Sequence, residues 1–269
     1  MSSILEPMLR KLELRNVLDA SDRAAILALP YQLRSGERGT CLVREGDRPE
    51  RACLLLTGFA CRHKVTSAGG RQIVSIHIPG DFVDLQSAFL DIADHNVEAL
   101  GRCEFAMVAH ADVRALACAR PPVALAMWMD TLIEAAIYRE WIINNGRRGA
   151  LARVAHLICE LGSRLHAVGL ASADRFEIPL NQDQMADATG LTPVHVNRTL
   201  RELDRTGLID RVARTVHVKD WAGLREIADF NETYLHFDQL AAKRETQCAP
   251  APSARRDPPA ESLMPVAAG

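Results

Sequence analysis

Residues 181–205 read NQDQMADATGLTPVHVNRTLRELDR, and this stretch decides how the C-terminal half of the chain is organised. Asn181 is a good N-cap for a short helix, and Gly190 follows it at a point where a turn needs a residue with positive φ. Thr192 then caps a second helix, with Pro193 at the first helical position, where its missing N–H costs no hydrogen bond. The stretch predicts two helices joined by a tight turn.

The second of these helices has one apolar face and one polar face. Val196, Leu200 and Leu203 recur at spacings of four and three and are expected to face inward. The residues left for the outward face or its flanks are His195, Asn197, Arg198, Arg201 and Arg205. A helix-turn-helix of this kind lays its second helix in the major groove of DNA. A pair of helices with ordinary solvated arginines is the alternative.

A short β-hairpin with a basic tip is predicted directly after the second helix. Residues 207–218 supply its two strands, with Arg211 and Arg214 at the tip. Six basic and three acidic residues lie within 192–219, a local excess of three positive charges in a chain whose net charge is -2. Phosphate contacts would concentrate on such a segment. The predicted DNA-contacting residues are Gln182, Thr192, Pro193, Val194, His195, Asn197, Arg198, Arg201, Arg211 and Arg214.

The N-terminal half has a shorter apolar period. Two short helical patterns lie within residues 5–29. From about residue 33 to residue 108, short β-prone runs then alternate with turn residues such as Gly58 and Gly70. Many short strands at this spacing predict an antiparallel sandwich or roll. Beyond it, the stretch from Val123 to Asn145 reads as one long helix.

The long helix carries a candidate dimerisation seam. Leu125, Met129, Leu132 and Ala136 alternate at spacings of four and three, a pattern that Arg139 interrupts further on. Two helices that pack side by side need such a seam, so we predict that these residues join two copies of the chain. The alternative is an ordinary helix that lies on its own domain.

These patterns divide an α+β protein into four predicted segments. Residues 1–120 form an N-terminal antiparallel β-roll that senses a signal, and residues 121–148 form the dimerisation helix. Residues 149–235 form a C-terminal winged helix-turn-helix domain. Residues 244–269 are rich in alanine and proline and are expected to be a disordered tail.

Composition narrows the function further. The chain shows no signal peptide and no apolar run near the roughly 20 residues that span a bilayer, so we expect a cytoplasmic protein without a membrane partner. The seven cysteines are widely spaced and include no Cys-x-x-Cys pair, which favours reduced, buried thiols. A redox or iron–sulfur role for them stays open. No phosphate-loop, dinucleotide-binding or metalloprotease motif is present, so we expect neither catalysis nor a bound metal.

The order of β-roll, long helix and winged helix-turn-helix resembles the Crp/Fnr family, the cyclic-AMP receptor protein/FNR family of bacterial transcription regulators, over about residues 10–235. The motifs that carry the resemblance are Leu56-Thr57-Gly58, Gly70-Arg71-Gln72-Ile73 and Pro79-Gly80-Asp81 in the roll and residues 186–200 in the helix-turn-helix. The resemblance implies a homodimer that regulates transcription by binding double-stranded DNA at an inverted repeat. RNA polymerase is a further candidate partner.

Two departures from the family pattern concern the DNA sequence that is read. The family's base-contacting arginine falls on Arg198, which we expect to hold a guanine through both ends of its guanidinium. The family's glutamate, which accepts a hydrogen bond from a base, falls on Val194, and an arginine before it falls on Pro193. Arg211 and Arg214 are expected on phosphates. We predict that DNA binding is retained but that the target sequence differs.

The sequence does not assign the effector. Cyclic nucleotide-binding members hold the phosphate with an arginine–serine pair, where this chain has residues 91–98 with three carboxylates and no arginine. We therefore expect no cyclic AMP binding and assign no cofactor. The oxygen-sensing members carry a cysteine cluster near the N-terminus, whereas the first cysteine here is Cys41. His77 is a candidate haem ligand, but a strand histidine with its ring partly in solvent is the favoured interpretation.

The main alternative function is a ligand-sensing β-roll that acts through protein contacts, with the C-terminal helices docking a partner protein. DNA binding through phosphates weakens steeply as salt rises, whereas docking through apolar surface does not. Salt dependence therefore separates the two functions.

Overall fold

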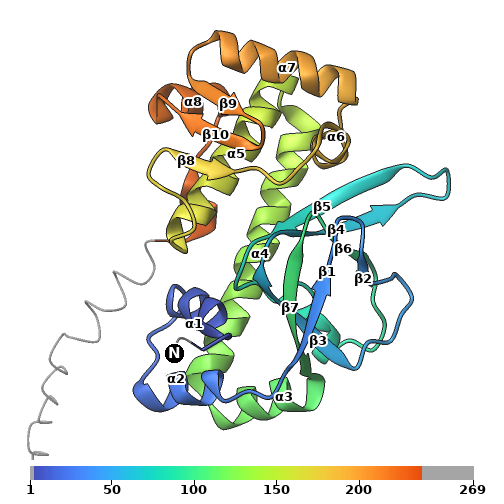
Figure 1. Ribbon diagram of the computed structural model, residues 1–269, viewed down its shortest axis with the longest axis vertical. Coiled ribbons are helices and arrows are strands. Elements are labelled where there is room, and N and C mark those ends of the chain that lie inside the picture. Colours follow the sequence, from blue (N-terminus) through green and yellow to red (C-terminus); the bar gives the residue numbers. More distant parts are fainter. Residues whose placement is uncertain (1–2, 238–269) are drawn as a thin grey trace, which may run out of the picture.

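The structure, a computed structural model, describes residues 3–237, so the predicted tail at 244–269 lies outside the described part. The N-terminal region is an antiparallel β-roll of two sheets, as predicted (Figure 1). One sheet has the strand order β1 (Gln32–Gly36), β7 (Cys103–Ala109) and β3 (Arg51–Thr57). The other has the order β2 (Cys41–Val43), β6 (Asn96–Ala99), β4 (Ala60–Val65) and β5 (Arg71–His77).

The core of the roll lies between these two sheets. Leu55 of β3 and Phe105 of β7 pack with Val97 of β6, and all three are fully buried. The turn from β3 to β4 requires Gly58, because its φ is +80° and an added Cβ would collide with the carbonyl oxygen of Arg102. Alternation of inward and outward side chains along the strands thus builds the roll that the period of two predicts.

Three short helices cover the other face of the β1-β7-β3 sheet. They are α1 (Glu6–Glu13), α2 (Ala20–Leu27) and α3 (His110–Ala119). The carboxylate of Asp19 caps α2 by accepting a hydrogen bond from the backbone N–H of Asp22 at 2.8 Å. Sequence patterns indicated α1 and α2 but not α3, which follows β7 without a glycine or proline to mark its start.

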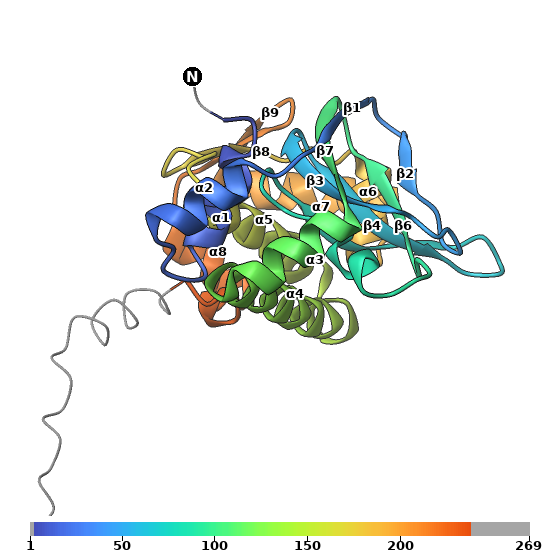
Figure 2. The same ribbon diagram turned by 90° about the horizontal axis from the view of Figure 1, so that it is seen from below.

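The helix α4 (Pro121–Arg147) runs from the bottom of the roll to the C-terminal domain (Figure 1). Seen from below, it lies beneath the β-roll and the α1–α2 pair (Figure 2). Its 27 residues slightly exceed the predicted helix, because the glycine at 146 does not end it. No helix within residues 3–237 is long and apolar enough to cross a membrane.

The C-terminal domain combines helices with a small three-stranded sheet. It contains α5 (Ala150–Ala167), β8 (Arg175–Glu177), α6 (Gln182–Thr189), α7 (Pro193–Arg205), β9 (Ile209–Val212), β10 (Thr215–Val218) and α8 (Trp221–Ala228). The sheet has the order β8-β10-β9, so the predicted hairpin gains a third strand that the sequence patterns did not indicate. Two short 3-10 helices, η1 (Leu85–Ala88) and η2 (Glu232–Leu235), lie in the roll and after α8.

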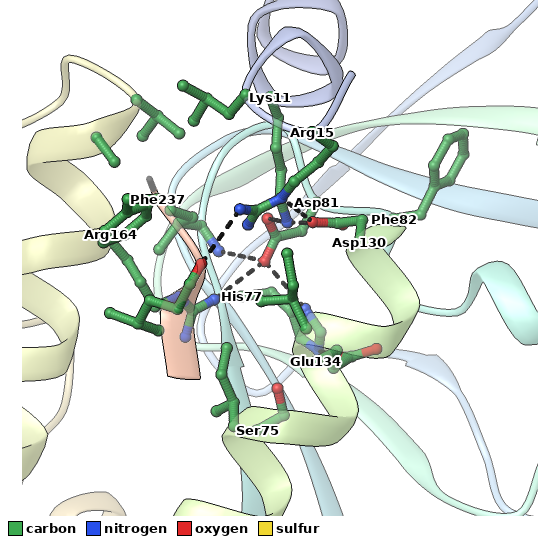
Figure 3. Close-up of a pocket in the computed structure, with 17 residues that line it drawn as sticks. Lys11, Arg15, Ser75, His77, Asp81, Phe82, Asp130, Glu134, Arg164 and Phe237 are labelled. Atoms are coloured by element: carbon green, nitrogen blue, oxygen red, sulfur yellow. Dashed lines mark hydrogen bonds and ion pairs between the residues drawn. The ribbon is translucent and has the colours of Figure 1, made fainter. Parts of the chain in front are cut away.

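A buried charge cluster joins α1, the β-roll, α4 and α5. Its four cations and four carboxylates are Lys11, Arg15, Arg62 and Arg164 with Asp81, Asp130, Glu134 and Glu160. Asp81, in the turn after β5, pairs with Lys11 of α1 and with Arg164 of α5, the latter at 3.3 Å (Figure 3). Among these eight residues the opposite charges are equal in number, so each buried ion has a partner that offsets the cost of its burial.

The helix α4 enters the buried charge cluster through two carboxylates one turn apart. Asp130 lies 3.0 Å from Lys11 Nζ of α1 and 3.0 Å from Nε of Arg15, which follows α1. Glu134 lies 2.7 Å from Arg62 Nη1 of β4. Helix α4 is thereby tied to the N-terminal helix on one side and to the roll on the other.

His77 is fully buried beside this cluster, so the expectation of a ring partly in solvent is wrong. Its Nδ1 lies 3.3 Å from Asp81 Oδ2, and its Nε2 lies 3.8 Å from Glu134 Oε1. Burial lowers the pKa of His77 and the nearby Arg62 lowers it further, so the ring is neutral at pH 7. The adjoining cavity of about 40 Å³ admits water but is too small for a porphyrin.

We predict that Asp81→Asn destabilises the protein strongly. Burial alone would raise the pKa of Asp81, but Lys11, His77 and Arg164 outweigh it and hold the pKa well below its usual value. The substitution leaves buried cations without a counter-charge, which costs about 3 kcal/mol or more. The measurement is the free energy of unfolding by urea at pH 7, with the exposed Asp91→Asn as control.

The sign of the pH dependence follows from the lowered pKa. The stability from Asp81 is fully present above its unfolded pKa of about 3.9 and is lost as the pH falls through the folded value. The gap in unfolding free energy between wild type and Asp81→Asn should therefore narrow on acidification below about pH 4. An Asp81→Asn protein within about 0.5 kcal/mol of wild type at pH 7 would contradict the assignment.

Candidate nucleic-acid interface

The first helix of the helix-turn-helix begins and ends as the sequence predicts. The side chain of Asn181 accepts a hydrogen bond from the backbone N–H of Gln184 at 2.8 Å, and the Gln184 side chain accepts one in return from the N–H of Asn181 at 3.1 Å. Gly190 ends α6 with a φ of 63°. These local signals place α6 at a defined angle to the next helix.

The second helix, α7, also follows its predicted pattern. The hydroxyl of Thr192 accepts a hydrogen bond from the backbone N–H of His195 at 3.2 Å, and Pro193 is the first helical residue. Val196, Leu200 and Leu203 are buried against the domain core. Packing of that face leaves the opposite face of α7 on the outside of the molecule (Figure 1).

A shallow groove of about 500 Å³ runs along the outer face of α7. It is lined by Gln182, Pro193, Val194, Asn197, Arg198, Arg201 and Arg205. Most of the residues predicted to contact DNA therefore lie together, although Gln182 comes from α6 and the rest from α7. Thr192 and His195 flank the groove, where their capping bond shapes the start of α7.

Three arginines of the groove are available to a ligand. Arg198, Arg201 and Arg205 are exposed, and none of them forms an ion pair or side-chain hydrogen bond with any residue from 3 to 237. Spacings of three and four place them on one face of the helix. The arrangement is a row of free cations beside a groove, which suits a polyanion.

The two hairpin arginines lie elsewhere. Arg211 is within β9, not at the tip, and its guanidinium pairs with Asp204 of α7 at 2.9 Å and 2.6 Å. Arg214 occupies the turn, as predicted, but it lines a different cavity on the side of the β-roll. The position predicted for Arg211 was wrong because β9 extends to Val212, which leaves only Ala213 and Arg214 in the turn.

The β-roll touches the helix-turn-helix directly, a contact that sequence patterns did not indicate. Arg38 donates to the side chain of Gln184 at 2.8 Å. Gln72 of β5 donates to the carbonyl oxygen of Asp187 at 2.5 Å, and Arg71 lies 3.5 Å from the Asp187 carboxylate. These polar contacts set the position of α6 relative to the roll.

An apolar stripe lies exposed on α4. Leu125, Trp128, Leu132 and Ile142 belong to it, and Trp128 is 66% exposed. Ala136 is only 5% exposed because it packs inside its own chain, so its assignment to the seam is corrected. Predicted residue Met129 is half-buried. The exposed stripe thus contains Leu125 and Leu132, as predicted, but Trp128 and Ile142 belong to it in place of Ala136.

Comparison with known proteins agrees with this architecture. The model of the Crp-like helix-turn-helix domain matches residues 152–227, and the model of the cyclic nucleotide-binding domain matches residues 33–118. The chain belongs to the Crp/Fnr family of transcription regulators. Its C-terminal domain is the DNA-binding domain of that family, and the groove along α7 lies within the matched part.

Several relatives of this Crp/Fnr protein cover most of the chain. The transcriptional activator protein FnrL of Cereibacter sphaeroides is 28% identical over 214 residues, which are 78% of this chain and 85% of the relative. The nitrogen fixation regulation protein FixK of Azorhizobium caulinodans is 26% identical, with 66% of this chain and 71% of the relative covered. The solved structure of FixK2 from Bradyrhizobium japonicum is 25% identical with a TM-score of 0.67, covering 74% of this chain and 98% of that chain.

This Crp/Fnr protein has a cavity of about 620 Å³ between its β-roll and α4. Arg62 lines the cavity but already pairs with Glu134 and donates to the hydroxyl of Tyr138 at 2.6 Å. Asp94, one of the three carboxylates of residues 91–98, also lines it and contacts His95 at 2.6 Å. The guanidinium group of Arg62 is thus already bound to side chains of the protein, Glu134 and Tyr138.

Proposed function

We propose that this regulator acts as a homodimer that binds an inverted-repeat DNA site through α7, under the control of a signal received by the β-roll. The observation that carries the proposal is the row of three arginines, Arg198, Arg201 and Arg205, along the groove of α7, which have no ion-pair partner within residues 3–237. Unpaired guanidinium groups on an outward helix supply both phosphate contacts and base contacts. RNA polymerase as a partner and the cytoplasm as location stay predictions from the sequence.

The positions of the residues along the groove suggest which of them contact bases and which contact phosphates. Arg198 lies one turn into α7, close enough to the start of the helix to reach base edges, where its fork matches the two acceptors of a guanine. Val194, 81% exposed, offers only apolar contact, for instance to a thymine methyl group. Arg205, at the end of the helix, suits a phosphate.

The exposed stripe of α4 supports a dimer. A tryptophan and two leucines on one face of a helix are a contiguous apolar surface, which soluble proteins usually cover. Leu125, Trp128 and Leu132 are spaced by three and four residues, the spacing of a seam between two parallel helices. A second copy of α4 covers this stripe by two-fold symmetry, which also presents two copies of α7 to the DNA.

The residues that line the cavity beside α4 argue against cyclic AMP as the signal. A cyclic phosphate needs a free cation, yet Arg62 is held by Glu134 and Tyr138. The other cation of this lining, Lys64, pairs with Glu45 at 2.6 Å. Asp94 adds a negative charge to the same wall. The cavity is therefore proposed as the site of a signal of a different chemistry.

We expect Arg198→Ala to relax the preference for one base pair and to cost about 1–3 kcal/mol per half-site. The measurement is a binding matrix of wild type and variant against all single-base variants of a site selected from random DNA. Arg205→Ala should weaken every sequence alike and make binding less dependent on salt. Arg48, exposed on the roll, provides the control Arg48→Ala.

Equal loss of affinity by Arg198→Ala for every base variant would make Arg198 a phosphate contact instead of a base reader. Wild-type binding that does not respond to salt would favour the alternative of a protein-docking surface, because only phosphate contacts release counterions.

Charged replacements in the stripe should produce monomers. Leu125→Glu together with Leu132→Glu would bury like charges across a two-fold axis, a penalty of several kcal/mol. Light scattering should give the mass of one chain, and specific DNA binding should be lost. Leu33→Glu, at an equally exposed leucine of β1, should remain a dimer. An intact dimer for the double variant would show that another surface joins the copies.

Cyclic AMP at about 1 mM should leave the melting temperature and the DNA affinity unchanged. A ligand at 100 times its dissociation constant would add about 2.7 kcal/mol to the free energy of unfolding, which thermal melting detects readily. The control is sodium chloride at the same ionic strength. A rise in melting temperature that saturates with cyclic AMP would overturn this part of the proposal.

A further inference from the structure

A second cavity, of about 510 Å³, lies between the β-roll and the winged domain. Its volume is within the roughly 300–1,000 Å³ of small-molecule sites. Its walls come from α1, the turn between β3 and β4, the loop before β7, the end of α5 and the turn of the β9–β10 hairpin. It is distinct from the cavity beside α4, and an occupant would touch both domains.

The interior of this interdomain cavity is mainly apolar. Leu56 contributes from the end of β3, Phe59 from the turn that follows, and Leu100 from the loop before β7. Leu165 of α5 and Leu170, just after that helix, complete the apolar lining. Side chains of this kind gain free energy when an apolar body replaces water next to them. The lining therefore suits a hydrocarbon or aromatic group.

The charged residues of the interdomain cavity are predominantly cationic. Arg10, Arg102 and Arg214 line it from three separate segments, and among its lining residues in the described range 3–237 Glu177 is the one carboxylate. Three positive charges and one negative charge leave an excess of two. All three arginines are exposed, so their guanidinium groups are accessible to solvent and to a ligand.

These arginines are poorly engaged by the protein itself. Within residues 3–237, neither Arg102 nor Arg214 forms an ion pair or a side-chain hydrogen bond. Arg10 has only a long hydrogen bond of 3.5 Å to the carbonyl oxygen of Val168. By contrast, Arg211 in the same hairpin has a carboxylate partner. Unpaired guanidinium groups around an apolar cavity match a ligand with an anionic head.

We propose that the interdomain cavity binds an amphipathic anion, an apolar acyl or aromatic body that carries a carboxylate. The body fills the apolar interior, and the carboxylate is held by Arg102 and Arg214 with Arg10 nearby. Such a ligand connects the roll to the hairpin turn of the winged domain. The inference rests on this cavity alone and is independent of whether the protein binds DNA.

The test uses the full chain without DNA. The anionic aromatic probe 8-anilinonaphthalene-1-sulfonate is titrated by fluorescence and then displaced with decanoate or with decanol. Decanoate should displace the probe at concentrations at least about tenfold lower than decanol, because a hydrogen bond to a charged group contributes about that factor. Both competitors carry the same hydrocarbon body, so the comparison isolates the carboxylate.

Three variants locate the site. Arg102→Gln and Arg214→Gln should each weaken decanoate about tenfold, whereas Arg48→Gln, on the roll and outside the cavity, should not. Gly101→Phe should fill the cavity and abolish decanoate-sensitive probe binding. An added Cβ at Gly101 meets no atom within 4 Å, and a melting temperature equal to that of wild type is the check that the variant folds.

Displacement by decanol at the same concentrations as decanoate would overturn the anionic specificity. Decanoate binding that is unchanged in Gly101→Phe, or in both glutamine variants, would overturn the site. Because no DNA is present, these outcomes do not depend on the DNA-binding function. Loss of DNA binding in Arg198→Ala would in turn leave decanoate binding as it is in wild type.

Discussion

The balance of charge around Asp81 is the constraint on which the rest of the structure depends. This carboxylate lies in the interior between Lys11 of α1 and Arg164 of α5, next to the neutral ring of His77. Ions in a protein interior are tolerated only with partners in good geometry. The N-terminal helix, the end of β5 and the first helix of the C-terminal domain must therefore meet at one point and in one arrangement.

Helix α4 connects that point to the two regions where function is expected. Glu134 holds Arg62, which lines the cavity between the roll and α4, while Asp130 one turn earlier holds Lys11 of the buried charge cluster. A short series of ion pairs therefore connects the wall of this cavity to Arg164 in the first helix of the C-terminal domain. Such contiguous polar contacts are the physical means by which packed domains influence one another.

The two faces of α4 also show why its register could not be read from the sequence. The series Leu125, Met129, Leu132, Ala136 and the series Leu125, Trp128, Leu132, Ala135 both alternate at spacings of three and four. In the folded chain Ala136 is 5% exposed and Trp128 is 66% exposed, and that difference in burial selects the second series. Apolar periodicity identifies a helix with a seam but not which of two overlapping faces lies inward.

The sequence by itself determined the features that depend on neighbours along the chain. The cap at Thr192, the left-handed Gly190 and the inward row of α7 are local, because hydrogen bonds and spacing within a few residues define them. Tertiary structure alone decided the pairing of Arg211 with Asp204 and the buried position of His77. It also brought Arg10, Arg102 and Arg214 to one cavity. These contacts join segments distant in sequence, and only the packing of whole domains determines which charges meet.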